Sequence, residues 1–126
     1  MNLESPLARA RGLGSAGQGT QHWWQQRLTA MALLPLSLWF VGSMLMLHPA
    51  DHASMVQWMR SPMAAVLLLM FVAALLHHAQ LGVQVVIEDY VDPEWQKVAC
   101  IILVKFLAIL AGLASALAIL KTFLGL

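Results

Sequence analysis

Three long runs of apolar residues constrain this chain more than any other feature of its sequence. They cover residues 30–47, 62–87 and 98–120, and Lys105 is the only Lys, Arg, Asp or Glu within them. A helix needs about 20 mostly apolar residues to cross a hydrocarbon core of ~30 Å. Runs of this length without polar alternation exclude transmembrane strands. The sequence predicts an all-α integral membrane protein with three transmembrane helices, at about residues 28–48, 61–87 and 97–121.

Composition excludes several other classes of protein. Apolar residues make up 60% of the 126 residues and charged residues 10%, whereas a soluble domain is nearer half apolar and a quarter charged. The net charge of +1 comes without a basic tract, so we expect no nucleic acid among the partners. Cys100 is the single cysteine, which rules out a disulfide framework within the chain and a thiolate metal cluster.

The first 20 residues differ from the rest because they are rich in Gly, Ser and Ala. We expect a flexible cytoplasmic tail over residues 1–20 and a three-helix membrane anchor domain over residues 21–126. Three spans leave no room for a separate soluble domain. The small bundle is therefore expected to pack with a partner membrane subunit in the lipid bilayer.

The distribution of basic residues predicts how the chain is oriented. More of them lie near the side of the first span's N-terminus than near the opposite side. The first group is Arg9, Arg11, Arg27, Lys97 and Lys105, and the second is Arg60 and Lys121. Because basic residues favour the cytoplasmic side, we expect a cytoplasmic N-terminus. The loop between the second and third spans, at residues 88–97, then also faces the cytoplasm.

Polar side chains inside the second span carry the functional information. Ionisable groups in a span are costly and usually face a bundle interior or a ligand. His78 and Asp89 lie about three helical turns apart, so they share a face, with a rise of about 16 Å between them. If Asp89 marks the cytoplasmic edge, His78 lies near the middle of the membrane. Gly82, one turn from His78, leaves space for a flat ligand or another helix.

His78 therefore has two interpretations. A neutral imidazole is the usual protein ligand of haem iron, whereas one imidazole cannot hold zinc or copper alone. Apart from His77, no other histidine lies in the middle of a predicted span, so a second histidine ligand for haem must come from another chain. The sequence equally fits a hydrogen bond from His78 to a neighbouring span. We expect Gln80 and Gln84 to bond to neighbouring helices.

Residues 78–91, HAQLGVQVVIEDYV, resemble the signature of the membrane anchor (D) subunits of succinate dehydrogenase, respiratory complex II. The family pattern is His-Ala, a Gly four residues after the His, a Gln two residues later, and then Asp-Tyr-Val. Residues 22–30, HWWQQRLTA, also resemble the family's entry to the first span. The resemblance covers about residues 20–124.

The resemblance implies a haem site. His78 matches the axial ligand of haem b, whose other ligand comes from the partner cytochrome b subunit. Arg27 and His22 match basic residues near the haem propionates, although the spacing from His22 to Arg27 differs by one residue from the family form. His77 precedes the ligand, and alignment on Gly82 and the Asp-Tyr pair selects His78 over it.

The resemblance also implies a quinone site. Tyr90 matches the tyrosine whose hydroxyl donates a hydrogen bond to a quinone carbonyl, and Asp89 matches the acid that shapes and polarises the site. Without the resemblance, Tyr90 is an ordinary interfacial aromatic residue and Asp89 belongs to a solvated acidic loop. Lys105 is expected to extend along the lipid toward the cytoplasmic interface.

The function implied is that of a non-catalytic subunit of succinate:ubiquinone oxidoreductase in a bacterial inner membrane. It would anchor the flavoprotein and iron–sulfur subunits, because the chain has no flavin motif or cysteine set of its own. Two alternatives stay open. One is the anchor of a fumarate reductase type of quinone oxidoreductase, and the other is a membrane scaffold without a cofactor.

Overall fold

The computed structural model describes residues 6–7 and 16–126, and within residues 16–126 it contains three long helices and one short helix. They are α2 (Ala16–Met46), α3 (His52–Met59), α4 (Pro62–Tyr90) and α5 (Glu94–Leu124). The three long helices are long and apolar enough to cross a membrane. The predicted all-α class with three spans is therefore confirmed.

The long helices mostly extend beyond the predicted spans. Helix α2 begins at Ala16, inside the segment assigned to the tail, whereas residues 1–5 and 8–15 lie outside the described residues. Helix α4 continues to Tyr90 and α5 begins at Glu94, so the predicted loop at 88–97 shrinks to three residues. Lys97 lies in the first turn of α5, where its ammonium group is 3.5 Å from the carboxylate of Glu94.

Local sequence explains where the helices begin and end. Pro62 occupies the first turn of α4 after the N-cap Ser61, a position where its missing N–H costs nothing. Helix α5 ends at Gly125, whose φ of 75° lies in the left-handed region that glycine adopts readily. The N–H of Leu126 then donates to the carbonyl of Lys121 at 3.0 Å.

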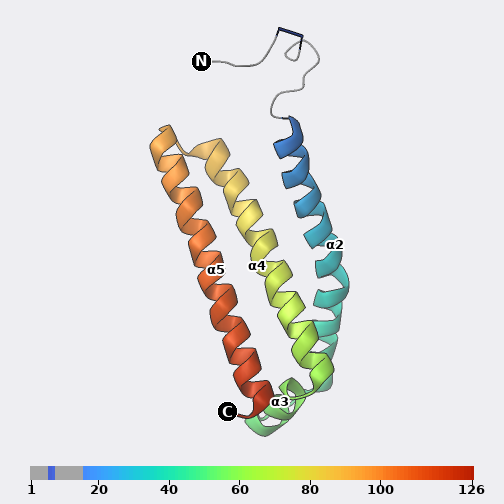
Figure 1. The fold of residues 1–126 in the computed structure, drawn as a ribbon. Helices are drawn as coiled ribbons and strands as arrows, with labels where there is room; N and C mark the ends of the chain where they lie inside the picture. Colours follow the sequence, from blue (N-terminus) through green and yellow to red (C-terminus); the bar gives the residue numbers. More distant parts are fainter. Residues whose placement is uncertain (1–5, 8–15) are drawn as a thin grey trace.

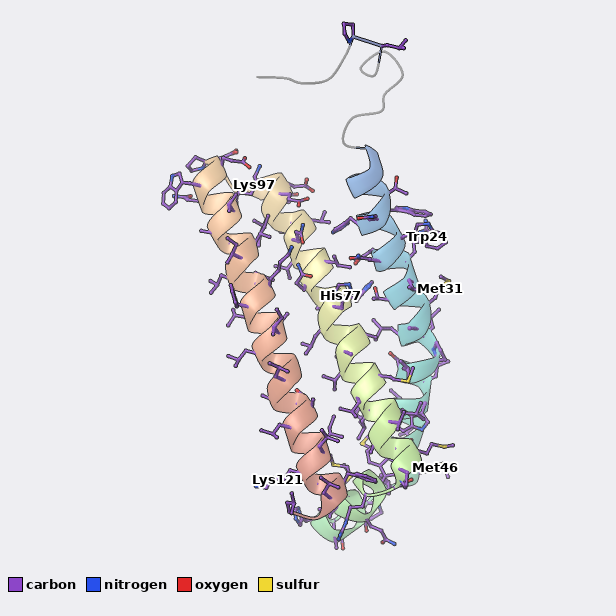
Figure 2. The ribbon with its side chains drawn as sticks, in the orientation of Figure 1. Trp24, Met31, Met46, His77, Lys97 and Lys121 are labelled. Atoms are coloured by element: carbon purple, nitrogen blue, oxygen red, sulfur yellow. The ribbon has the colours of Figure 1, made fainter. Side chains whose placement is uncertain are left out.

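Helix α4 is the central element (Figure 1). It packs against both α2 and α5, while α2 and α5 do not pack on each other within the described part of the chain. The start of α2 and the α4–α5 turn lie at one end of the bundle, and α3 and the C-terminus lie at the other (Figure 1). Lys97 and Lys121 mark these two ends on α5 (Figure 2). Because α4 lies between α2 and α5, its side chains face both of these helices.

The best-packed region lies at the α3 end. Ala65 and Leu68 of α4 and Ile119 of α5 form a buried cluster. Trp39 of α2 stacks on Trp58 of α3 with ring centroids 5.6 Å apart. The predicted spans leave residues 49–60 as a connection between them, so α3 was not predicted from the sequence.

Most of the apolar surface faces outward. The share of residues buried inside the chain is 6% for the apolar window of α2, 17% for α4 and 0% for α5. Lipid and other membrane subunits can cover such faces because the bilayer core is itself apolar.

Candidate functional site

His78 is held by a hydrogen bond from α4 to α2. Its Nδ1 lies 3.1 Å from Oγ1 of Thr29, and the same hydroxyl lies 2.7 Å from the carbonyl oxygen of Gln25. The hydroxyl oxygen lies closer to the Gln25 carbonyl, which only accepts, than to Nδ1. We therefore assign the hydroxyl proton to the bond with Gln25, so that the hydroxyl oxygen accepts the Nδ1–H of His78. The tautomer assigned from this network leaves the lone pair on Nε2 available to a metal.

This contact confirms one interpretation of His78 without excluding the other. The expected interhelical hydrogen bond is present. The bond uses Nδ1 alone, however. Histidines that bind a metal through one ring nitrogen commonly form a hydrogen bond through the other nitrogen.

A groove between α2 and α4 joins His78 to Arg27. It has a volume of about 430 Å³, and apolar side chains form most of its remaining wall. These wall residues are Ala30, Met31, Leu33 and Leu34, with Ser37 beside them. Arg27 also lies over the Trp23 ring, with Cζ 4.9 Å from the centroid, a favourable cation–π distance. An imidazole, a guanidinium and an apolar wall together suit a flat apolar ligand that carries acidic groups.

Gly82 lies close to this region and faces α2. A Cβ built there would lie 3.9 Å from Nε2 of Gln26, the nearest atom, which is an ordinary van der Waals distance. Packing within the chain therefore does not require glycine at this position.

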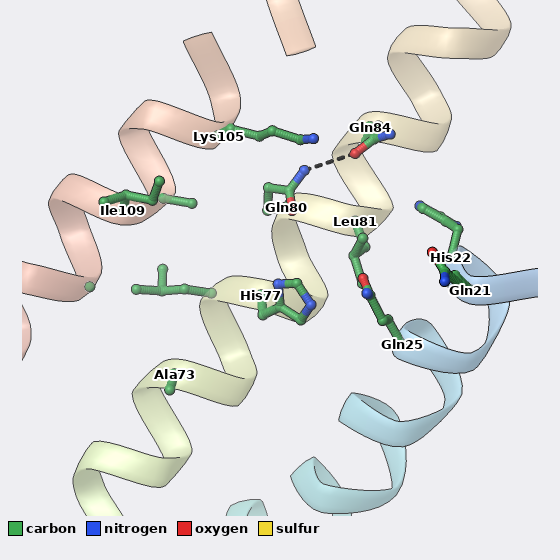
Figure 3. Close-up of a pocket in the computed structure, with 13 residues that line it drawn as sticks. Gln21, His22, Gln25, Ala73, His77, Gln80, Leu81, Gln84, Lys105 and Ile109 are labelled. Atoms are coloured by element: carbon green, nitrogen blue, oxygen red, sulfur yellow. Dashed lines mark hydrogen bonds between the residues drawn. The ribbon is translucent and has the colours of Figure 1, made fainter. Parts of the chain in front are cut away.

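His22 lines a different cavity, so the structure does not bring it together with Arg27 and His78. This second cavity, of about 520 Å³, is bounded by α2, α4 and α5 and also takes in His77 and Lys105. Figure 3 shows Lys105 extending from α5 toward α4, and not along the outer face as expected for a lipid-exposed lysine. Nε2 of His22 is buried without a hydrogen-bond partner.

Two glutamines of this cavity form a ladder along α4. Nε2 of Gln80 donates to Oε1 of Gln84 at 2.9 Å, and Nε2 of Gln84 donates to Oε1 of Glu88 at 3.0 Å. Within the described residues, these hydrogen bonds of Gln80 and Gln84 run along α4 and do not reach another helix of this chain. Sequence reasoning also missed the cavity itself. The four-residue spacing of the three side chains was an available signal, because such residues are neighbours on a helix.

Asp89 and Tyr90 are the last two residues of α4, at the end of the bundle where α2 begins. Tyr90 is 82% exposed, and Asp89 is exposed as well. Among the described residues, neither side chain has a hydrogen-bond partner. The helical rise from His78 to Tyr90 is about 18 Å. The two groups are thus open to an external ligand at some distance from the groove.

Comparisons with known proteins agree with one another. Residues 1–112 match the model of the succinate dehydrogenase/fumarate reductase transmembrane subunit family. The chain is 35% identical to the succinate dehydrogenase hydrophobic membrane anchor subunit of Rickettsia bellii (strain RML369-C), with 94% of each chain covered. It is 31% identical to the subunit of the same name from Paracoccus denitrificans, with 94% of this chain and 92% of that one covered. No solved structure gives a significant match.

Proposed function

Because the chain belongs to the family of succinate dehydrogenase hydrophobic membrane anchor subunits, we propose that it supplies an axial ligand to haem b and part of a ubiquinone-reduction site. The observation that carries the haem role is the contact of 3.1 Å between Nδ1 of His78 and the hydroxyl of Thr29, from which the tautomer is assigned. His78, whose Nε2 is not used in this contact, lines the same groove as the guanidinium of Arg27.

The groove residues fit a haem. Nε2 of His78 would ligate the iron, Arg27 would pair with a propionate, and Met31 and Leu34 would contact the porphyrin. No group of three or more metal-ligating residues occurs among the described residues, but a haem needs a single ligand from this chain. The second ligand would come from the partner cytochrome b subunit. When bound, haem supplies a one-electron carrier.

His22 is left out of this proposed haem site. It lines the cavity of His77 and Lys105, and its spacing from Arg27 departs from the family form. Arg27 alone is therefore proposed as the propionate partner from this chain.

Tyr90 and Asp89 are proposed to serve ubiquinone. The Tyr90 hydroxyl would donate to a quinone oxygen on which negative charge builds during reduction, and a donor already in place stabilises that charge. Asp89 would pass protons from the adjacent water, since quinol formation consumes them. Electrons would arrive from the iron–sulfur subunit after the flavoprotein subunit oxidises succinate. The exposure of both side chains supports this role.

We also propose the location and orientation of the chain. The family and the three spans make it a multi-pass membrane protein, and the excess of basic residues near the start of α2 supports a cytoplasmic N-terminus. The membrane is taken to be a bacterial inner membrane. Asp89 and Tyr90 then face the cytoplasm.

An optical difference spectrum of the purified complex tests the haem role. We expect reduced cytochrome b bands in the wild type and their loss or shift in His78→Ala. His77→Ala is the matched control, because His77 is the neighbouring imidazole and lines the other cavity. Unchanged bands in His78→Ala would contradict the assignment. A wild-type complex without bands would remove the haem role and leave either a quinone-site anchor or a scaffold without a cofactor.

Succinate:ubiquinone activity tests the quinone role. Tyr90→Phe removes the hydroxyl and keeps the ring, and losing one hydrogen bond to a charged group should lower the rate about tenfold or more. Trp95→Phe is the control, because Trp95 is an exposed aromatic residue at the same end of the bundle. Equal rates for the wild type and Tyr90→Phe would exclude the proposed hydrogen bond.

A further inference from the structure

We propose that Thr29 is a positioning residue for His78, which fixes the ring tautomer and lowers the reduction potential of the haem. The inference rests on the proposed role of His78 as a haem ligand. It adds a residue on a different helix, 49 positions away in the chain.

The geometry leaves the Thr29 hydroxyl little freedom. Its oxygen lies 2.7 Å from the carbonyl oxygen of Gln25 and 3.1 Å from that of Gln26, both within its own helix. Either bond commits the hydroxyl proton to the backbone of α2. The side chain is also β-branched, so its χ1 angle is restricted in a helix. Thr29 therefore presents a fixed acceptor to α4.

The position of this acceptor decides the state of the imidazole. With the hydroxyl proton assigned to the backbone of α2, the ring nitrogen 3.1 Å from this oxygen is assigned the proton of the imidazole. Nδ1–H of His78 therefore donates to Thr29, and Thr29 donates to Gln25. Such chains of hydrogen bonds polarise one another in a low-dielectric interior.

The chain of bonds should raise the electron density on Nε2. An accepting partner on the second ring nitrogen makes an imidazole a more basic ligand, and a more basic ligand favours ferric over ferrous iron. Removing the acceptor should therefore weaken the ferric state more than the ferrous state and raise the reduction potential.

Another threonine provides a matched control. The Thr122 hydroxyl donates to the carbonyl of Ala118 at 2.9 Å, four residues back in α5. It makes the same bond to its own helix as Thr29, but no histidine is bonded to it. Thr122→Val therefore reproduces the loss of the helical bond without the loss of the contact to His78.

The experiment is a redox titration of haem b in the purified complex, with haem content measured in the same samples. Loss of such a partner typically changes metal affinity ~10-fold or more. If that loss falls on the ferric state, the potential in Thr29→Val rises by about 59 mV. Thr29→Ser keeps the hydroxyl and should behave as the wild type, as should Thr122→Val. Thr29→Ala is a second removal of the hydroxyl, to be measured if the valine variant does not assemble.

Two results would overturn the role of Thr29. One is a wild-type potential in the variant without a hydroxyl, and the other is an equal shift in Thr29→Ser and Thr29→Val. Failure of the haem assignment would look different, because His78→Ala would then keep the wild-type bands or the wild type would show none.

Discussion

At the scale of residues, adjacent histidines of α4 have separate surroundings. His78 bonds to Thr29 and lines the groove with Arg27. His77 lines the cavity on another face of the same helix, because consecutive residues are about 100° apart around a helix. Polarity does not distinguish the two imidazoles. Helix phase does distinguish them, because it directs each ring to different neighbours.

Gly82 provides a prediction about this groove. Among the described residues, the one atom within 4 Å of an added Cβ lies at an ordinary contact distance, so Gly82→Ala should leave assembly intact and favour α4 by about 0.5–1 kcal/mol. A haem beside His78 would meet the new methyl group, and the cytochrome b bands should shift or weaken. Gly42→Ala is the control, because an added Cβ there has nothing within 4 Å. Identical spectra for the wild type and Gly82→Ala would argue that no ligand approaches this glycine.

The sequence supports part of the site. A histidine deep in an apolar run must find a partner or a ligand, which is why His78 could be singled out, and its interhelical bond was one expected outcome. Its partner was not identifiable, because Thr29 lies on a different helix and its contact depends on how α2 rotates against α4. His22 shows the same limit, since a one-residue change in spacing turns a helical side chain to another face.

At the scale of elements, α3 shows how a short helix depends on its surroundings. Eight residues are too few for an isolated helix to be stable in water. Asp51 caps it by accepting from the N–H of Ser54 at 2.8 Å, and the stacking of Trp58 on Trp39 attaches it to α2. The long spans were predictable because their length and apolarity are local properties. Helix α3 was not, because its stability comes from a cap and from distant packing.

The cap of α3 should depend on pH. Hydrogen bonds from Ser54, first from its side chain and then from its backbone N–H, hold the pKa of the Asp51 carboxyl below its ordinary value. A lowered folded-state pKa means that the cap is fully present above the ordinary pKa of about 4 and is lost as pH falls through the lowered pKa. Amide exchange of Ser54, corrected for intrinsic pH dependence, should therefore lose protection in acid. Asp51→Asn keeps a capping oxygen that does not titrate, so a similar acid loss in this variant would refute the explanation.

At the scale of the whole molecule, α4 contributes residues to two separate cavities on different faces. The groove between α2 and α4 is lined by His78, and the cavity bounded by α2, α4 and α5 is lined by Gln80 and Gln84, whose hydrogen bonds continue to Glu88 outside the cavity lining. Of the two, only this cavity has walls from both α2 and α5, which do not pack on each other in the described part of the chain. Three apolar runs predict three spans, but they do not predict which helix is central, because that depends on contacts between residues distant in sequence.

The proposed orientation can be tested by labelling. In a Cys100→Ala background, Gln57→Cys places a thiol on α3 and Asp92→Cys places one in the α4–α5 turn, at opposite ends of the bundle. With an impermeant maleimide on intact spheroplasts, we expect Gln57→Cys to react and Asp92→Cys to react only after the membrane is opened. Denatured samples of both variants check that each thiol is reactive. The reverse pattern would invert the assignment.

The small share of each span that is buried inside the chain also has a consequence for the amount of this protein in the cell. Helix α5 buries none of its apolar window inside the chain, and α2 buries 6%, so intramolecular packing contributes little to holding the spans together. Where a fold is completed by another subunit, its stability is tied to the concentration of that subunit. Copies made in excess would keep loosely joined helices that proteases in the membrane can reach. We therefore expect the scarcest subunit of the assembly to set the steady-state amount of this chain, whatever its own rate of synthesis.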